Sequence, residues 1–472
     1  MELKPGSHIH LMGICGTAMA SLAGLLKDRG FKITGSDSNP YPPMSTQLES
    51  LGIPILKPYR AENLQPRPDF VIVGNVISKA NPEAEELLKS EIPYTSLPQA
   101  MGEFIIENRE SIVIAGTHGK TTTTSLMSWV ATQVGVQPGF MIGGIAKNFS
   151  KSFQNPVGNY FVIEGDEYDT AFFDKVPKFT HYRPRHVILT SVEFDHADIY
   201  KDLEAVKAAF RLLMKKTPVD GTFLYWGEDA NIRSMISDCL TKKKFSYGFQ
   251  QCDYLISGMK TDGEKTQFQV SFQGADLGRF HLPLSGQYNV LNATAVIGLC
   301  HQQGWDLQKV KAAFQSFLGV KRRQEVLGEP RGILVIEDFA HHPTAVKETL
   351  RGLKEKYPRR KVHAIFEPRS ATSRRKVFQK DYVEAFKQSD AVYLAQAFDT
   401  SKIDEQERFS SQELSQDLRE QGVSAAMDFP SVDEIVNAVT AQAKSGDMVV
   451  VMSNGGFEGI YQKLLQSLEK GT

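Results

Sequence analysis

The segment VIAGTHGKTTTTSL, residues 113–126, has the side chains and spacing of a phosphate-binding loop. Its apolar start is expected to be a short strand, and a helix is expected to begin at Lys120. Gly116 and Gly119 allow the backbone N–H groups around them to turn inward on an anion, and the positive end of the helix adds to the attraction. Lys120 would neutralise phosphate charge, and the Thr121 hydroxyl would ligate the Mg2+ that accompanies ATP.

The loop departs from the strict pattern GxxxxGK[ST], because Ile114 stands where that pattern needs a glycine. It matches a shorter form, GTxGKT, and the alternative is a glycine turn before an ordinary helix. The strand expected before the loop and the helix expected after it favour phosphate binding. The loop residues predicted to surround ATP are Gly116, Thr117, His118, Gly119, Lys120, Thr121 and Thr122.

A second glycine turn, GICGTA at residues 13–18, falls where a dinucleotide-binding fingerprint would fall. Cys15 replaces the middle glycine of GxGxxG, and Ala18 replaces the third. Asp37, at the end of the next expected strand, is where an acid would bind a ribose. Cys15 weakens the case for a nicotinamide cofactor, another nucleotide diphosphate fits equally well, and a turn without a ligand is the remaining alternative.

Strands and helices alternate through most of the chain, which predicts an α/β protein with parallel sheets. We expect three domains, at residues 1–108, 109–319 and 320–472. The first and third are expected to be Rossmann-like, and the central one P-loop ATPase-like. Alternating segments in residues 244–284 predict a small additional antiparallel sheet. The strands expected in the third domain are Ile333–Glu337, Val362–Phe366, Ala391–Ala395 and Met448–Met452.

The composition is that of a globular protein with balanced charge, with 54 basic residues, 55 acidic residues and 41% hydrophobic residues. Balanced charge gives no general attraction to nucleic acid or anionic lipid. The chain has no run of 18 apolar residues, so we expect no helix that spans a membrane. The four cysteines form no CxxC pair, which favours reduced thiols. We therefore expect a cytoplasmic protein that binds neither nucleic acid nor membrane.

Six motifs, in this order, resemble those of the Mur ligases, the ATP-dependent enzymes that build the peptide stem of bacterial peptidoglycan. They are GTHGKTTT, VIEGDEYD, SVEFDHAD, GQYNVLNA, KRRQE and EDFAHHPTA. The resemblance covers essentially the whole chain. It implies an amide-forming ligase that uses ATP, with Mg2+ or alternatively Mn2+, through an acyl phosphate. The first glycine turn and the following GSD resemble the branch that accepts UDP-N-acetylmuramate.

Two enzymes of that branch compete. One joins the recycled tripeptide L-alanyl-γ-D-glutamyl-meso-diaminopimelate to UDP-N-acetylmuramate, and the other adds L-alanine during de novo synthesis. The segments DEYDTAFFDKVPKFTHYRPR, EPRS, NPYPPMST and VMSNGGFEGIYQKLL resemble the tripeptide ligase. We expect tripeptide ligation in peptidoglycan recycling, with L-alanine ligation as the alternative. The expected partners are these small molecules, and the expected assembly is a monomer or a weak homodimer.

The resemblance also assigns a catalytic centre. Lys120, Glu164 and His196 would be catalytic, and Glu164 and His196 would join Thr121 around the metal. A carboxylate suits Mg2+, whereas imidazole is a softer ligand. The alternative for His196 is a capping or core histidine, and the alternative for Glu164 is one face of a solvated loop.

Four further residues would contact ATP by resemblance. Asn289 and Asn292 would face adenine, and the alternative for them is a helix N-cap followed by an exposed polar position. Arg323 and Asp338 would reach from the third domain toward ATP, where a planar guanidinium suits spread phosphate charge. Arg322 is an equally close candidate by its chemistry.

Substrate contacts are expected on the first and third domains. In open α/β sheets, ligands bind outside the carboxyl ends of the strands, and an arginine there suits a peptide carboxylate. One of His341 and His342 is expected to contact substrate and the other to cap the next helix. The residues predicted for the UDP-sugar are Gly13, Ile14, Cys15, Gly16, Thr17, Ala18 and Asp37. Those predicted for the peptide are His341, Arg369, Ser370, Asn454, Gly455 and Phe457.

Two functions of other classes stay open on the sequence. A nicotinamide oxidoreductase would use the first glycine turn, although Cys15 and the Lys120 loop both disfavour it. A nucleotide-driven switch would hydrolyse ATP without a co-substrate and would not need a third domain that carries Arg323 and Asp338.

Overall fold

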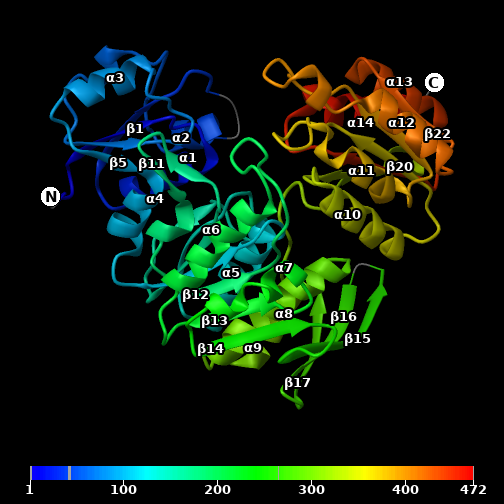
Figure 1. Cartoon of the computed structure of the whole chain (residues 1–472), viewed down its shortest axis with the longest axis horizontal. Coiled ribbons are helices and arrows are strands. Elements are labelled where there is room, and N and C mark those ends of the chain that lie inside the picture. Colours follow the sequence, from blue (N-terminus) through cyan, green and yellow to red (C-terminus); the bar gives the residue numbers. More distant parts are fainter. Residues whose placement is uncertain (1–2, 41–43, 264, 471–472) are drawn as a thin grey trace.

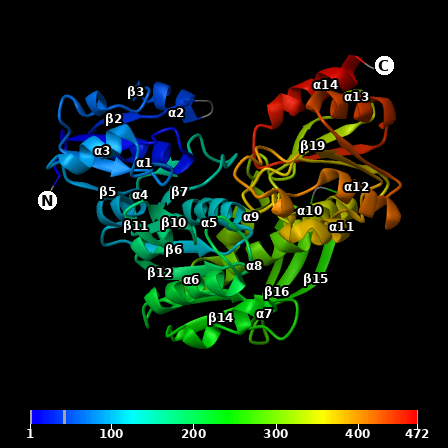
Figure 2. The same ribbon diagram turned by 45° about the horizontal axis from the view of Figure 1, so that its top comes forward.

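The computed structural model describes residues 3–40, 44–263 and 265–470. It contains three large sheets, formed in turn by the first, middle and last parts of the chain. The first and last parts both rest on the middle part, as Figures 1 and 2 show. Residues 41–43, within the NPYPPMST segment, lie outside the described residues.

The first sheet has five parallel strands in the order β3-β2-β1-β4-β5. The strands are β1 His8–Met12, β2 Lys32–Ser36, β3 Ile55–Leu56, β4 Phe70–Val73 and β5 Tyr94–Ser96. The helices are α1 Thr17–Asp28, α2 Met44–Ser50, α3 Pro82–Lys89 and α4 Leu97–Ala100. The predicted βαβ unit is confirmed, so the GICGTA turn joins the carboxyl end of β1 to the start of α1.

The middle sheet has ten strands in the order β17-β16-β15-β14-β13-β12-β6-β9-β7-β8. Its strands are β6 Glu110–Ala115, β7 Gly139–Met141, β8 Phe153–Gln154, β9 Tyr160–Gly165, β12 Pro184–Leu189, β13 Thr222–Trp226, β14 Lys243–Gly248, β15 Tyr254–Asp262, β16 Lys265–Phe272 and β17 Ala275–Leu282. A separate hairpin pairs β10 Asp169–Ala171 with β11 Asp174–Pro177. The helices are α5 Lys120–Val134, α6 Leu203–Lys216, α7 Ala230–Arg233, α8 Gln287–Gln302 and α9 Leu307–Gln315.

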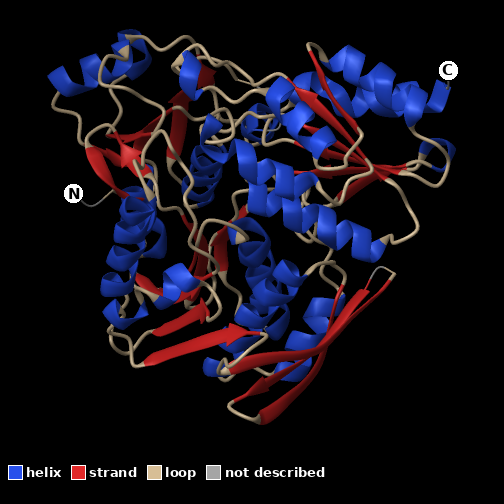
Figure 3. Ribbon diagram, turned by 45° about the vertical axis from the view of Figure 1, so that its right-hand side comes forward, coloured by secondary structure: helices blue, strands red, loops and turns tan. Residues whose placement is uncertain are grey.

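The antiparallel strands predicted in residues 244–284 are confirmed as β15, β16 and β17, the long strands at the lower edge of Figure 3. Hydrogen bonds between β14 and β15 join them to the parallel strands, so they extend the main sheet. The central strands are apolar on both faces because helices cover both faces. Ile112 and Ile114 of β6 pack with residues of α5 and α8, whereas Val113 and Ala115 belong to the cluster that contains α6.

The last sheet has six strands in the order β18-β19-β23-β20-β21-β22, parallel except for β18. The strands are β18 Glu325–Gly328, β19 Leu334–Asp338, β20 Val362–Phe366, β21 Ala391–Ala395, β22 Ala425–Phe429 and β23 Met448–Met452. The helices are α10 Pro343–Lys356, α11 Gln379–Phe386, α12 Ser411–Glu420, α13 Val432–Gln442 and α14 Ile460–Lys470. One apolar cluster lies under α10, α11 and α12, and a second lies under α13 and α14 on the opposite face.

Short turns complete the chain. The 3-10 turns are Ala61–Leu64, Lys178–His181, Ile236–Asp238, Pro330–Gly332, Lys376–Phe378, Glu405–Glu407 and Phe457–Gly459, and a π-helical turn covers Met101–Ile106. In the part of the chain that the structure describes, every helix is too short or too polar to pass through a lipid bilayer.

The first part of the chain is fixed to the middle part along α1. Gly24 of α1 lies against the ring of Phe153, which is 2% exposed, and a Cβ on Gly24 would fall inside that ring. At the end of the helix, Arg29 donates to the Asn155 amide oxygen at 2.8 Å. The close approach of this helix therefore depends on the missing side chain of Gly24.

We predict that Gly24→Ala destabilises this contact even though alanine favours helices, because the buried Phe153 ring has to move. Overpacking of this kind costs about 1–3 kcal/mol, which should lower the melting temperature by about 5 °C. In a Phe153→Leu background the same change should be neutral or stabilising. An equal loss in both backgrounds, measured by thermal unfolding, would contradict the contact.

Candidate active site

Two glycines shape the loop between β6 and α5. Gly119 has φ +83° and precedes the first helical residue, Lys120, which begins α5 where the sequence predicts. A Cβ on Gly119 would lie 2.8 Å from the amide oxygen of Asn292, and one on Gly116, at φ +129°, would lie 2.8 Å from the backbone nitrogen of Ser191. Both positions therefore exclude a side chain, and α5 begins immediately after the loop.

Lys120 is held across its own loop. Its ammonium donates to the carbonyl of Gly116 at 2.7 Å and to the Glu167 carboxylate at 3.0 Å. Burial alone would lower the pKa of Lys120, but the charges of Glu167 and Asp166 outweigh it and raise the pKa. The lysine is therefore charged where a phosphate would enter.

Glu164 presents a carboxylate beside the Thr121 hydroxyl. Thr121 donates to one carboxylate oxygen at 3.0 Å, and the backbone N–H of Gly143 donates to the other at 2.6 Å. Burial, followed by the charge of Asp166, raises the pKa of Glu164. Two adjacent oxygen donors with excess negative charge fit a hard cation such as Mg2+. The predicted metal ligands Thr121 and Glu164 are thus brought together.

His196 comes from the loop after β12 and has φ +54°. Its Nε2 lies 3.4 Å from the Glu167 carboxylate, and its ring centroid lies 4.9 Å from that of Tyr168. Burial would lower the pKa of His196, but the hydrogen bond and charge of Glu167 raise it. Glu167 therefore joins Lys120 to His196, a role that the sequence prediction missed although Glu167 lies in the VIEGDEYD motif.

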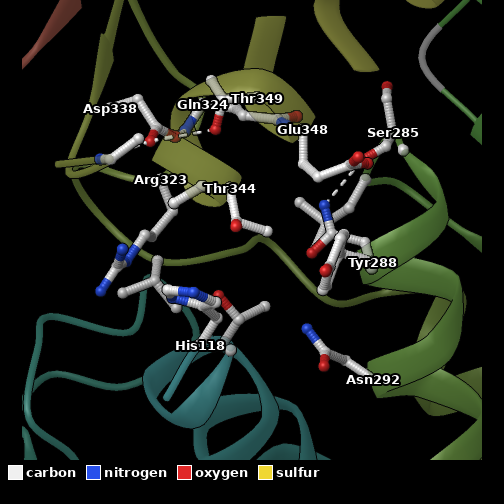
Figure 4. Close-up of a pocket in the computed structure, with 18 residues that line it drawn as sticks. His118, Ser285, Tyr288, Asn292, Arg323, Gln324, Asp338, Thr344, Glu348 and Thr349 are labelled. Atoms are coloured by element: carbon white, nitrogen blue, oxygen red, sulfur yellow. Dashed lines mark hydrogen bonds between the residues drawn. The ribbon is translucent and has the colours of Figure 1, made fainter. Parts of the chain in front are cut away.

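A pocket opens between the middle and last parts of the chain, and Figure 4 shows it in close-up. The middle part lines it with His118, Gly119, Thr122, Tyr288, Asn289 and Asn292. The last part lines it with Arg323, Asp338, Thr344, Ala345 and Glu348. The asparagines, the arginine and the aspartate predicted to contact ATP therefore share one pocket with the phosphate loop.

The two neighbouring arginines separate in the structure. Arg322 stays within the last part of the chain, where it pairs with Glu337 at 2.6 Å and donates to the carbonyl oxygens of Ser453 and Gly455. Arg323 lines the pocket, with its guanidinium 4.6 Å from the Phe339 ring centroid. Burial lowers the pKa of Arg323, although the charges of Asp338 and Glu164 act in the opposite direction. Arg323 is therefore the arginine placed to meet an anion.

The side chains of Asp338 and Asn289 form hydrogen bonds with backbone groups of the protein. The Asp338 carboxylate accepts from the backbone N–H groups of Gln324 and Ala340, both at 2.8 Å. Asn289 donates to the carbonyl of Ser285 at 2.7 Å. Asp338 thus fixes the chain that carries Arg323.

The glycine turn at the end of β1 presents backbone more than side chain. Ile14 is fully buried and Cys15 is nearly so, whereas Gly16 and Thr17 are exposed. Asp37 accepts from the backbone N–H of Cys15 at 3.0 Å. The side chain of Ile14 fills the core, so a ligand bound at this position would meet its backbone.

The residues predicted to bind peptide differ in the contacts that their side chains make. Arg369 lies beside Gly455, pairs with Glu367 at 3.2 Å and stacks 3.7 Å from the ring centroid of the exposed Phe398. Ser370 donates to Ser373 at 2.9 Å. The Asn454 Oδ1 atom is buried and finds no hydrogen-bond partner among the described residues.

Phe457, one of the residues predicted to bind peptide, turns its side chain into the core. Phe457 is 1% exposed and packs in the apolar cluster under α13 and α14. The two histidines before α10 take different places. His342 caps this helix by accepting from the backbone N–H of Thr344 at 3.3 Å, and His341 Nε2 lies 3.9 Å from Asp195.

We predict that Arg323→Ala weakens ATP binding at least about tenfold, since hydrogen bonds to charged groups contribute about 1.5–3 kcal/mol. Arg322→Ala is the matched control. It should leave ATP affinity unchanged and lower the melting temperature, because it strands the Glu337 carboxylate. Calorimetric titration of both variants with ATP and Mg2+ measures the difference, and a larger effect at Arg322 would contradict the assignment.

Models of one family match most of the chain. The model "Mur ligase family, catalytic domain" matches residues 8–109, "Mur ligase middle domain" matches 114–300, and "Mur ligase, glutamate ligase domain" matches 322–455.

Individual relatives are similar to this chain over nearly its full length. The UDP-N-acetylmuramate–L-alanyl-gamma-D-glutamyl-meso-2,6-diaminoheptandioate ligase of Haemophilus influenzae is 39% identical over 464 residues, which are 98% of this chain and 99% of the relative. The UDP-N-acetylmuramate–L-alanine ligase of Desulfitobacterium hafniense is 31% identical and covers 97% of this chain and 99% of the relative. The crystal structure of a murein peptide ligase from Psychrobacter arcticus is 36% identical, with a TM-score of 0.74 over 99% of this chain and 100% of that one. This chain therefore belongs to the Mur ligase family.

Proposed function

We propose that this chain is an ATP-dependent ligase that joins L-alanyl-γ-D-glutamyl-meso-diaminopimelate to UDP-N-acetylmuramate in peptidoglycan recycling. The observation that best supports a ligase reaction is that the phosphate loop and Arg323 line the same pocket. The choice of tripeptide over L-alanine is supported by the relatives, because the Haemophilus ligase is 39% identical and the L-alanine ligase 31%.

The proposed reaction activates a carboxylate that would otherwise not react with an amine. The lactyl carboxylate of UDP-N-acetylmuramate attacks the γ-phosphorus of ATP, a new O–P bond forms, and ADP leaves. The amino group of the tripeptide then attacks the acyl carbon, the bond from carbon to the phosphate oxygen breaks, and the nitrogen loses a proton as phosphate departs. Positioning and charge neutralisation supply most of the catalysis in such transfers.

Charged side chains of the pocket would neutralise the transferring group. Lys120 keeps its charge in the phosphate loop, and the planar guanidinium of Arg323 suits charge spread over phosphate oxygens. Thr121 and Glu164 would hold Mg2+, which would neutralise phosphate charge when bound. Glu167 would orient His196 toward the same place.

The first and last parts of the chain would hold the two co-substrates. We expect the exposed backbone at Gly16 and Thr17 to bind the diphosphate of the UDP-sugar at the start of α1. Arg369 and the backbone at Gly455 would bind peptide carboxylates. A monomer or weak homodimer in the cytoplasm, where ATP and UDP-sugars are made, completes the proposal.

We predict that ADP release requires the tripeptide together with UDP-N-acetylmuramate, and that the tripeptide exceeds L-alanine by at least about 100-fold in kcat/KM. The assay follows ADP and identifies the UDP-muramyl tripeptide by mass. Faster turnover with L-alanine would contradict the choice of substrate. ADP release without either co-substrate would favour a nucleotide switch.

We predict that Arg369→Ala raises the KM for tripeptide at least about tenfold and leaves the KM for ATP unchanged, since it removes a charge-assisted contact to a carboxylate. Arg375→Ala is the control, because it removes a nearby guanidinium that already pairs with Glu407 at 2.8 Å. Steady-state kinetics with each substrate varied in turn gives the comparison. Equal peptide KM values in the two variants would rule out this role for Arg369.

A further inference from the structure

The loop after β12 connects the phosphate loop to the last part of the chain through Glu193. His118 Nε2 lies 3.0 Å from one carboxylate oxygen of Glu193. The backbone N–H of Glu193 donates to the Thr117 hydroxyl at 2.9 Å, and that hydroxyl donates to the carbonyl of Glu193 at 3.2 Å. Two consecutive residues of the phosphate loop are thus bound to one residue.

The same carboxylate is bound from the opposite side of the pocket. The Thr344 hydroxyl, in the first turn of α10, donates to the same Glu193 oxygen at 2.7 Å. His342 Nδ1 lies 3.5 Å from it, and His342 Nε2 donates to the carbonyl of Phe194 at 3.2 Å. The rings of His118 and His342 are 4.7 Å apart, so the two parts of the chain meet at this oxygen.

The charges of this contact suit hydrogen bonding. Burial would raise the pKa of Glu193, but the hydrogen bond and charge of His118 and the charge of His342 lower it to about 2. Burial, together with the charge of His118, lowers the pKa of His342 to about 4. At neutral pH, a charged carboxylate therefore accepts from His118 and Thr344 beside a neutral imidazole.

A metal ion is the competing occupant, because donor atoms of His118, Glu193 and His342 lie within 4.8 Å of one another. The hydrogen bonds disfavour it. The oxygen of Glu193 that faces both histidines already accepts two hydrogen bonds, and His342 Nδ1 accepts one from the backbone N–H of Thr344 at the start of α10. A metal would have to displace all three contacts.

We propose that Glu193 is a positioning residue that couples nucleotide binding in the phosphate loop to docking of the last part of the chain. ATP that orders Thr117 and His118 would place the carboxylate to receive Thr344, and docking of α10 would in turn hold His118 against the nucleotide. This inference rests on the ATP-dependent function proposed above. It needs neither the tripeptide nor the UDP-sugar.

The neighbouring residue Asp195 provides a matched control. Its carboxylate accepts from the Thr372 hydroxyl at 2.6 Å, and that hydroxyl accepts from the backbone N–H of Ala197 at 3.2 Å. This contact also joins the loop to the last part of the chain, but no hydrogen bond links it to the phosphate loop among the described residues. Thr372→Val should therefore loosen docking without changing its response to nucleotide.

The test is small-angle X-ray scattering of the full chain with and without a non-hydrolysable ATP analogue at saturating concentration with Mg2+. We expect the analogue to reduce the radius of gyration of the unmodified protein and of Thr372→Val. We expect no reduction in Glu193→Gln and Thr344→Val. Glu193→Gln and Thr344→Val should each bind the ATP analogue at least about fivefold more weakly than the unmodified protein. The two losses should not add in the double variant, because both substitutions remove the same contact.

Two results would overturn the proposal. One is analogue-induced compaction in Glu193→Gln equal to that of the unmodified protein. The other is stoichiometric Zn2+ bound to the purified protein and lost in His342→Gln, which would make the cluster a metal site. Because closure is measured without co-substrates, a different acyl acceptor in the ligase reaction would leave its outcome unchanged.

Discussion

One lysine and three carboxylates share the entrance to the phosphate loop, and the rest of the site depends on how they pair. A buried ion costs several kcal/mol unless it is paired or hydrogen-bonded. Lys120 is paired with Glu167, Asp166 is paired with Lys178 at 3.0 Å, and Glu164 is held by a hydroxyl and a backbone N–H. The negative charge that remains on Glu164 is matched to a cation, which would accompany the phosphates.

The paired charges at the phosphate loop are also connected to the contacts that hold the last part of the chain in place. Glu167 reaches His196, and the loop that carries His196 also carries Glu193 and Asp195, which hold the last part of the chain. Arg323 and Asp338 belong to that last part, so they complete the pocket only when it is docked. The ATP pocket and the docking contacts are therefore one connected structure at the carboxyl ends of the sheets.

Much of the fold and part of the site could be predicted from the sequence. The bounds of β20, β21 and β23 agree with the predicted strands, because buried parallel strands are short continuous apolar runs. The strand β22, AAMDF, and the edge strand β18, EVLG, were missed because each carries an acid and lacks such a run. The phosphate loop was recognisable because its chemistry is local.

Contacts between distant residues escaped prediction. Neighbouring arginines look equivalent in a sequence, but φ +62° at Arg322 turns the chain so that only Arg323 lines the pocket. Glu193 and Asp195 find their partners 151 and 177 residues away, and no local pattern announces such pairs. Phe457 follows two glycines at a strand end, a pattern typical of a ligand loop, yet its apolar ring is buried.

In the proposed reaction, the γ-phosphoryl group of ATP moves to the carboxylate of UDP-N-acetylmuramate before the amide forms. The most direct measurement uses UDP-N-acetylmuramate labelled with ¹⁸O in that carboxylate, with tripeptide, ATP and Mg2+, and mass analysis of the released phosphate. We expect one labelled oxygen in each phosphate, because one carboxylate oxygen leaves with the phosphorus. Unlabelled phosphate accompanying the amide product would contradict it.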